Sequence, residues 1–184
     1  MVDVTWPPLA ITFVAACIAA VTDIWRFRVY NMLTFPLVLT GLAYHGAFGG
    51  TSGFLDSTLG VLFGFGVLLL PYLLGLMGAG DVKLMAGVGA WLCFKATALV
   101  FVASALVAGA YAIALILYRG KLSESWLTIK LIFYRFAALG IHLGKQDLVE
   151  PLCQSSDRRL RLIPFGAMLP LGIIAALLWT VWTQ

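Results

Sequence analysis

Long apolar stretches dominate this chain and decide in which solvent it can fold. A helix needs about 20 apolar residues to cross a bilayer, and it suits that environment because its backbone polar groups bond within the segment. We therefore predict an all-α, polytopic membrane protein with six transmembrane helices, forming a single membrane-embedded domain over residues 1–184. The six apolar stretches cover residues 6–22, 32–48, 58–77, 82–94, 97–118 and 162–182.

The scarcity of charge supports the same prediction. Asp, Glu, Lys and Arg make up 11% of the residues, whereas a soluble domain carries about 25%, so the chain has too little charge to cover a water-facing surface. The same scarcity excludes a nucleic-acid-binding protein, because the 12 basic residues are needed as loop anchors. Three cysteines without a Cys-x-x-Cys pair argue against a zinc module or a disulfide framework.

The basic residues predict the orientation of the chain. If the N-terminus lies outside, eleven of the 12 fall on the cytoplasmic side and only Lys95 does not; such asymmetry sets membrane topology. Both termini are then extracytoplasmic, and residues 119–161 form one sizeable cytoplasmic loop. Its mixture of aromatic, aliphatic and basic residues predicts an interfacial helix, which serves either as a connector or in substrate docking.

Three aspartates, Asp23, Asp56 and Asp81, lie close to the predicted membrane boundaries. Carboxylates in such positions are costly and are functional suspects. Asp56 falls in the predicted outer turn 49–57, where capping the third span is a sufficient role. Asp23 ends the first span and Asp81 opens the fourth, so the predicted topology places both at one depth on the cytoplasmic face.

Two adjacent carboxylates share a proton and divide into a base and an acid. Such a pair can activate a water for attack on an amide carbonyl and then protonate the leaving amine. Helix dipoles favour Asp81, at a helix start, as the anion and Asp23, at a helix end, as the proton carrier. The residues alone leave open a structural alternative, in which Asp81 caps a helix and Asp23 pairs with Arg26 or Arg28.

Four neighbours of the two aspartates are further candidates. Gly78 and Gly80 let the backbone approach an extended substrate closely. Lys83 either holds Asp81 ionised or reaches toward lipid headgroups. Asn31 either hydrogen-bonds near the aspartates or caps the second span.

Three sequence blocks resemble the type IV prepilin peptidase family, the GxGD-type aspartic peptidases of the bacterial inner membrane. The first places Asn31 eight residues after Asp23 and continues with Leu33-Thr34; the second, at residues 78–84, matches GxGDxKL; the third is the Ile-Pro-Phe-Gly element at residues 163–166. With the order of the spans, the resemblance covers residues 9–182.

The resemblance implies an aspartic endopeptidase whose catalytic residues are Asp23 and Asp81, with Gly78, Gly80, Lys83 and Asn31 binding substrate or supporting the pair. It implies no metal and no cofactor. The substrate would be a prepilin, with a short basic leader joined to a hydrophobic helix, cut at the cytoplasmic face of the inner (plasma) membrane. The lipid bilayer and the pilus-assembly machinery would be its other partners.

Two departures from the family pattern refine this expectation. Val29-Tyr30 stands where the family usually has Ile-Pro, and only eight or nine residues join the first two spans, without the cysteine-paired insertion of the longer enzymes. The short connection resembles the branch associated with tight-adherence (Flp) pilus systems, which implies an Flp-type prepilin. The resemblance does not extend to the longer enzymes' second activity, N-methylation by S-adenosylmethionine.

Other chemistries fit the sequence less well. Gly50-Thr51-Ser52-Gly53 matches the GxSG motif of rhomboid-type serine proteases, but Ser52 is predicted in an outer loop, and such a protease needs a buried Ser beside a His base. His45 is expected to be a polar interfacial residue. No HExxH motif suggests a metalloprotease.

The alternative outside enzymes is a small ion- or proton-coupled transporter, or a pilus-assembly membrane subunit, that uses the same two aspartates. Against a transporter, both acids lie at one face and no inverted repeat is evident. The glycine pairs Gly60/Gly64 and Gly87/Gly89 predict close helix packing.

Overall fold

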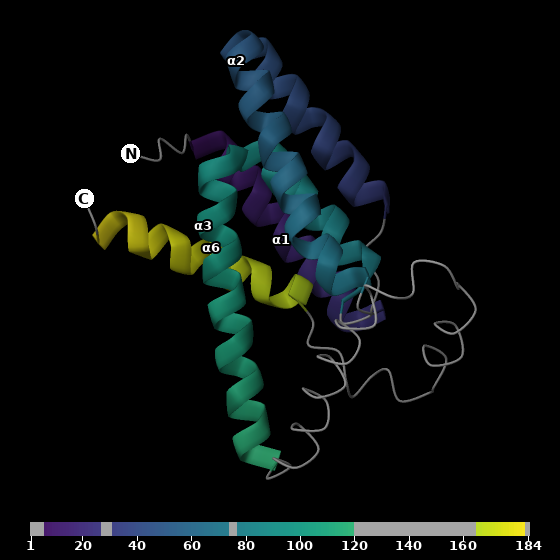
Figure 1. Cartoon of the computed structure of the whole chain (residues 1–184), viewed down its shortest axis with the longest axis vertical. Coiled ribbons are helices and arrows are strands. Elements are labelled where there is room, and N and C mark those ends of the chain that lie inside the picture. The colour runs from purple at the N-terminus through teal and green to yellow at the C-terminus, as the bar shows by residue number, and fades with distance from the viewer. Residues whose placement is uncertain (1–5, 27–30, 74–76, 120–164, 183–184) are drawn as a thin grey trace, which may run out of the picture. The chain divides into compact units, whose positions relative to one another are not determined.

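The computed structural model of the chain describes residues 6–26, 31–73, 77–119 and 165–182. These residues form α1 (Trp6–Arg26), α2 (Asn31–Leu73), α3 (Ala79–Arg119) and α6 (Phe165–Trp182) (Figure 1). The described part of the chain contains no strand, so the predicted all-α class is confirmed there. The predicted loop 119–161, with its interfacial helix, lies outside the described residues apart from its first residue, Arg119.

Each of the two long helices contains one residue with a non-helical backbone. Gly50 in α2 has φ 60° and ψ −150°, and Cys93 in α3 has φ 58° and ψ −178°. Glycine adopts a positive φ at little cost because it has no Cβ, whereas Cys93 is the one non-glycine residue among those described that does so. The chain turns back at Gly50, and the two halves of α2 lie side by side (Figure 1).

The two breaks fall near boundaries expected from the sequence, although the outer turn is much shorter than predicted. Residues 49–57 were expected to form a loop, yet the helix resumes directly after Gly50, because one glycine with a positive φ is sufficient for the reversal. Asp56 therefore lies exposed within a helix, and the prediction that it caps the third span is wrong.

Two helical stretches of the described residues are long and apolar enough to cross a membrane, namely α2 and residues 79–114 of α3. α1 and α6 contain shorter apolar stretches, Trp6–Thr22 and Met168–Trp179. The number of crossings and the location of the termini stay predictions.

The chain divides into two compact units. One contains residues 1–109 and 164–184, and the other contains residues 110–163. Of the second unit the structure describes residues 110–119, which continue α3 to Arg119.

The first half of α3 packs against both halves of α2. Every residue from 84 to 92 is buried, as expected of a helix that is apolar all round. Gly87 faces Leu37, and Gly41 faces Ala90, so this segment runs parallel to the first half of α2.

The contacts with the second half of α2 have the opposite order. Gly64 faces the backbone of Met85, and Gly60 faces the carbonyl of Gly89, so the two segments are antiparallel. A Cβ on Gly60 or Gly89 would overlap the backbone of the other residue. The predicted packing role of both glycine pairs is therefore confirmed.

The remaining helices add small and branched residues to the same core. α1 contacts α6 and α2, and it contributes the fully buried Ala16 and Ala19. α6 contributes Leu169 and Ile173, which are also fully buried. Gly172 of α6 faces Ser104 of α3 so closely that a Cβ there would overlap it.

Two glycines of α2 allow a test of this packing with identical chemistry. We expect Gly60→Ala to lower the free energy of unfolding by about 1–3 kcal/mol, because the new methyl overlaps the Gly89 carbonyl. Gly66→Ala should leave it unchanged or raise it by up to about 1 kcal/mol, since Gly66 is helical and has no atom within 4 Å of the added methyl. Thermal unfolding in detergent measures both; equal effects would contradict the packing role.

Candidate functional site

Asp81 is held at the start of α3 by its glycine-rich sequence. It lies in the first turn of the helix and is half-buried. Its backbone N–H donates a hydrogen bond to the Gly78 carbonyl at 3.2 Å. A methyl group on Gly78 would lie 3.8 Å from Asp81 Oδ2, in van der Waals contact with the carboxylate. The exposed N–H groups of a helix start also stabilise a carboxylate.

A hydrogen bond joins the starts of α3 and α2 next to Asp81. Lys83 Nζ donates to Asn31 Oδ1 at 2.9 Å, and it lies 6.0 Å from the centre of the Phe35 ring, about the limit of a cation–π contact. Asn31 is also the first residue of α2, and both of its predicted roles, a hydrogen bond near the aspartates and a cap of the second span, stay predictions. The structure thus joins Asn31 to Lys83, two residues after Asp81 in the chain, across 52 positions of the sequence.

The direction of the helices places these residues at one end of the packed pair. Because the first half of α2 and the first half of α3 are parallel, Asn31 and Asp81 begin their helices at the same end. Asp23 belongs to the last turn of α1, a helix that contacts α2. The side chain of Asp23 lies outside the described residues, so its pairing with Asp81 stays a prediction.

Polar side chains at the other end of these helices bind backbone carbonyls near the break at Cys93. A helix that ends leaves its last carbonyls without intrahelical partners. Ser57 Oγ donates to the Ala90 carbonyl at 2.6 Å, and His45 Nε2, when protonated, donates to the Trp91 carbonyl at 2.9 Å. Thr97 Oγ1 donates to the Cys93 carbonyl at 2.5 Å. These residues therefore stabilise the interrupted helix.

The GxSG segment has no protease geometry. Ser52 is exposed and helical, not in a loop as predicted, and its hydroxyl donates to the Gly49 carbonyl at 3.1 Å. His45 is engaged by the Trp91 carbonyl and lies 3.7 Å from Cys93 Sγ. Ser52 and His45 therefore do not form the Ser–His pair that a serine protease needs.

No sequence pattern predicted two further contacts, which lie toward the other end of these helices from Asp81. The Trp91 indole N–H donates to the Leu37 carbonyl at 2.9 Å across 54 positions, and the His45–Cys93 contact spans 48. Among the described residues, no group of three or more His, Cys, Asp and Glu side chains could hold a metal ion.

Comparison with known proteins gives one consistent result. A profile of the type IV leader peptidase family matches residues 10–113, more than half of the chain. Proteins called "Prepilin leader peptidase/N-methyltransferase" from Aeromonas salmonicida (strain A449) and Aeromonas hydrophila are each 35% identical over 122 residues. That alignment covers 62% of this chain and 39% of each relative, so the chain spans well under half their length. No solved structure matches.

The hydrogen bond between Lys83 and Asn31 can be tested with a double-mutant cycle. We expect Asn31→Ala and Lys83→Met each to lower the free energy of unfolding by about 0.5–1.5 kcal/mol, and the double variant to lose no more than the larger single loss. The cycle isolates the coupling between the two side chains. Lys95→Met, at an exposed lysine, is the control, and fully additive losses in chemical unfolding would contradict a direct interaction.

Proposed function

Because this chain belongs to the type IV leader peptidase family, we propose that it is an aspartic endopeptidase that removes the leader peptide of prepilins. The match over residues 10–113 carries this proposal, since it includes both Asp23 and the Gly-x-Gly-Asp segment ending at Asp81. The Aeromonas relatives are called prepilin leader peptidases. We propose the peptidase activity, for which the two aspartates supply the acid and the base.

In the proposed mechanism, Asp23 and Asp81 share one proton and act on one water molecule. The ionised aspartate removes a proton from the water, whose oxygen attacks the scissile carbonyl carbon. The protonated aspartate donates a hydrogen bond to the carbonyl oxygen and later gives its proton to the leaving nitrogen. The products are the leader with a new carboxylate and the pilin with a new amino terminus.

The position of Asp81 suggests how the two aspartates divide these roles. Asp81 lies in the first turn of α3, where the free N–H groups favour the anion, and Asp23 lies in the last turn of α1, where the carbonyls disfavour it. Asp81 is then the base that activates water, and Asp23 is the acid. Lys83 and Asn31 position Asp81 by joining the starts of their helices.

The proposed location is the cytoplasmic face of the bacterial inner membrane. The positive-inside distribution of basic residues supports it. The parallel direction of the first halves of α2 and α3 is consistent with it, because the starts of both helices then lie at the same end. A prepilin with a basic cytoplasmic leader and a hydrophobic helix presents its scissile bond at this level. The short connection between α1 and α2 supports an Flp-type prepilin, and the pilus-assembly machinery is the further partner that we propose.

The catalytic roles can be tested by removing one charge at a time. Asp23→Asn and Asp81→Asn should each lower cleavage of a co-expressed prepilin by a factor of at least about 100, because the base or the acid is lost. Asp56→Asn is the matched control, since Asp56 is exposed on α2. The shift of prepilin on a gel measures processing, and immunoblotting shows whether the enzyme accumulates.

Normal maturation of prepilin by the Asp23→Asn/Asp81→Asn double variant would exclude the aspartate pair. It would also favour the interpretation of the chain as a transporter or an assembly subunit.

The topology can be tested independently of activity. A reporter enzyme that folds only outside the cytoplasm should be active when it is fused after Gln184, because an even number of spans returns the chain to the side where it began. The same reporter after Arg119 should be inactive. Activity of a cytoplasmic reporter after Gln184 would mean an odd number of spans and would contradict the predicted arrangement.

A further inference from the structure

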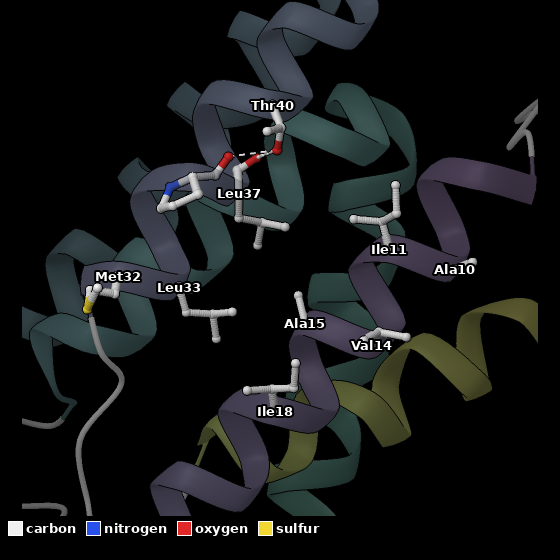
Figure 2. A pocket seen from close by; sticks show the side chains of 10 residues that line it. Ala10, Ile11, Val14, Ala15, Ile18, Met32, Leu33, Leu37 and Thr40 are labelled. Atoms are coloured by element: carbon white, nitrogen blue, oxygen red, sulfur yellow. Dashed lines mark hydrogen bonds between the residues drawn. The ribbon is translucent and has the colours of Figure 1, made fainter.

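An open groove of about 440 Å³ lies between α1 and the first half of α2 (Figure 2). Residues one helical turn apart on α1 line one wall, and residues with the same spacing on α2 line the other. Figure 2 places Ile18 of α1 and Leu33 of α2 at one end of the groove, with Ile11 and Thr40 toward the other.

The walls of the groove are suited to an apolar occupant. Ile11, Val14 and Ile18 are 39%, 56% and 47% exposed, and Met32 is 90% exposed. The one polar side chain, that of Thr40, donates its hydroxyl to the Pro36 carbonyl at 2.6 Å, so the groove does not offer it as an unsatisfied polar group. An apolar occupant would gain van der Waals packing in the groove and would not need to supply a polar partner.

The groove leads toward the end of the helices that carries the candidate site. Ile18 is five residues from Asp23 along α1, which corresponds to about 7.5 Å at 1.5 Å per residue. Met32 follows Asn31, whose side chain accepts the hydrogen bond from Lys83, two residues after Asp81. A peptide chain that runs from the candidate site along this groove would therefore contact apolar side chains directly beside the site.

We propose that the groove receives the first turns of the apolar helix of the substrate, on the side of the scissile bond that stays in the membrane. This inference rests on the proposed peptidase function. The lining of α1 extends from Ala10 to Ile18, about 12 Å along the axis, which matches about two turns of a bound helix. A helix fits better than a separate lipid chain, because its apolar segment is joined directly to the bond at the aspartates.

Photo-cross-linking tests the position of the substrate without depending on its cleavage. A photoreactive amino acid replaces Val14 or Met32 in the Asp81→Asn variant, and the control replaces Leu62, which is 62% exposed and does not line the groove. We expect the prepilin helix to be captured from Val14 and Met32 at least fivefold more than from Leu62. Equal capture at all three positions, or capture of lipid alone from the groove, would overturn the proposal.

A bulky substitution gives a kinetic test of the same groove. Val14→Trp should raise the KM for prepilin at least tenfold with little change in kcat, because the indole fills the groove away from the aspartates. Leu62→Trp should leave both values unchanged. Unchanged KM in Val14→Trp would overturn docking in the groove, while absence of cleavage by the wild-type chain would overturn the peptidase function itself; the cross-linking result separates the two cases.

Discussion

Direct contact between the backbones of α2 and α3 fixes the part of the fold that carries Asp81. Gly60 and Gly64 let the second half of α2 approach Gly89 and Met85 without an intervening side chain. In lipid there is little hydrophobic gain from bringing two helices together, so close packing must supply the stability. Asp81 lies about one helical turn before Met85, and its depth and direction therefore follow from the register of these glycines.

The far end of the same helix is fixed by hydrogen bonds to its backbone. The break at Cys93 releases carbonyls that would be costly to leave unsatisfied in an apolar environment. Ser57 and His45, one from each half of α2, bind the carbonyls of Ala90 and Trp91. The first half of α3 is thus held at its end by hydrogen bonds and along its length by contacts at glycines, and both constrain the helix that carries Asp81.

Local pattern predicted much of this arrangement, and contacts between distant residues account for most of what it missed. Apolar length predicted the helices, glycine spacing predicted their packing, and the GxGD segment placed Asp81 at a helix start. The segment after Gly50 suggested a longer loop, because Ser, Gly and Asp, the residue types at positions 52, 53 and 56, are common in turns. No glycine or proline marks Cys93 as a break, and the hydrogen bond from Lys83 to Asn31 depends on tertiary packing across 52 positions.

Exposed apolar side chains alone do not mark a docking surface in a protein of this kind. On α1 the small Ala16 and Ala19 are buried, while the larger Val14 and Ile18 are exposed; lipid accommodates this arrangement because small residues allow close packing and large ones meet acyl chains. Leu62 and Leu106 are at least as exposed as Val14, and neither lines the α1–α2 groove. The α1–α2 groove differs because it is concave and leads to the helix ends that carry Asp23 and Asn31. Position relative to the aspartates, more than apolarity, is therefore what connects this surface with the proposed substrate, whose scissile bond we place at the membrane boundary.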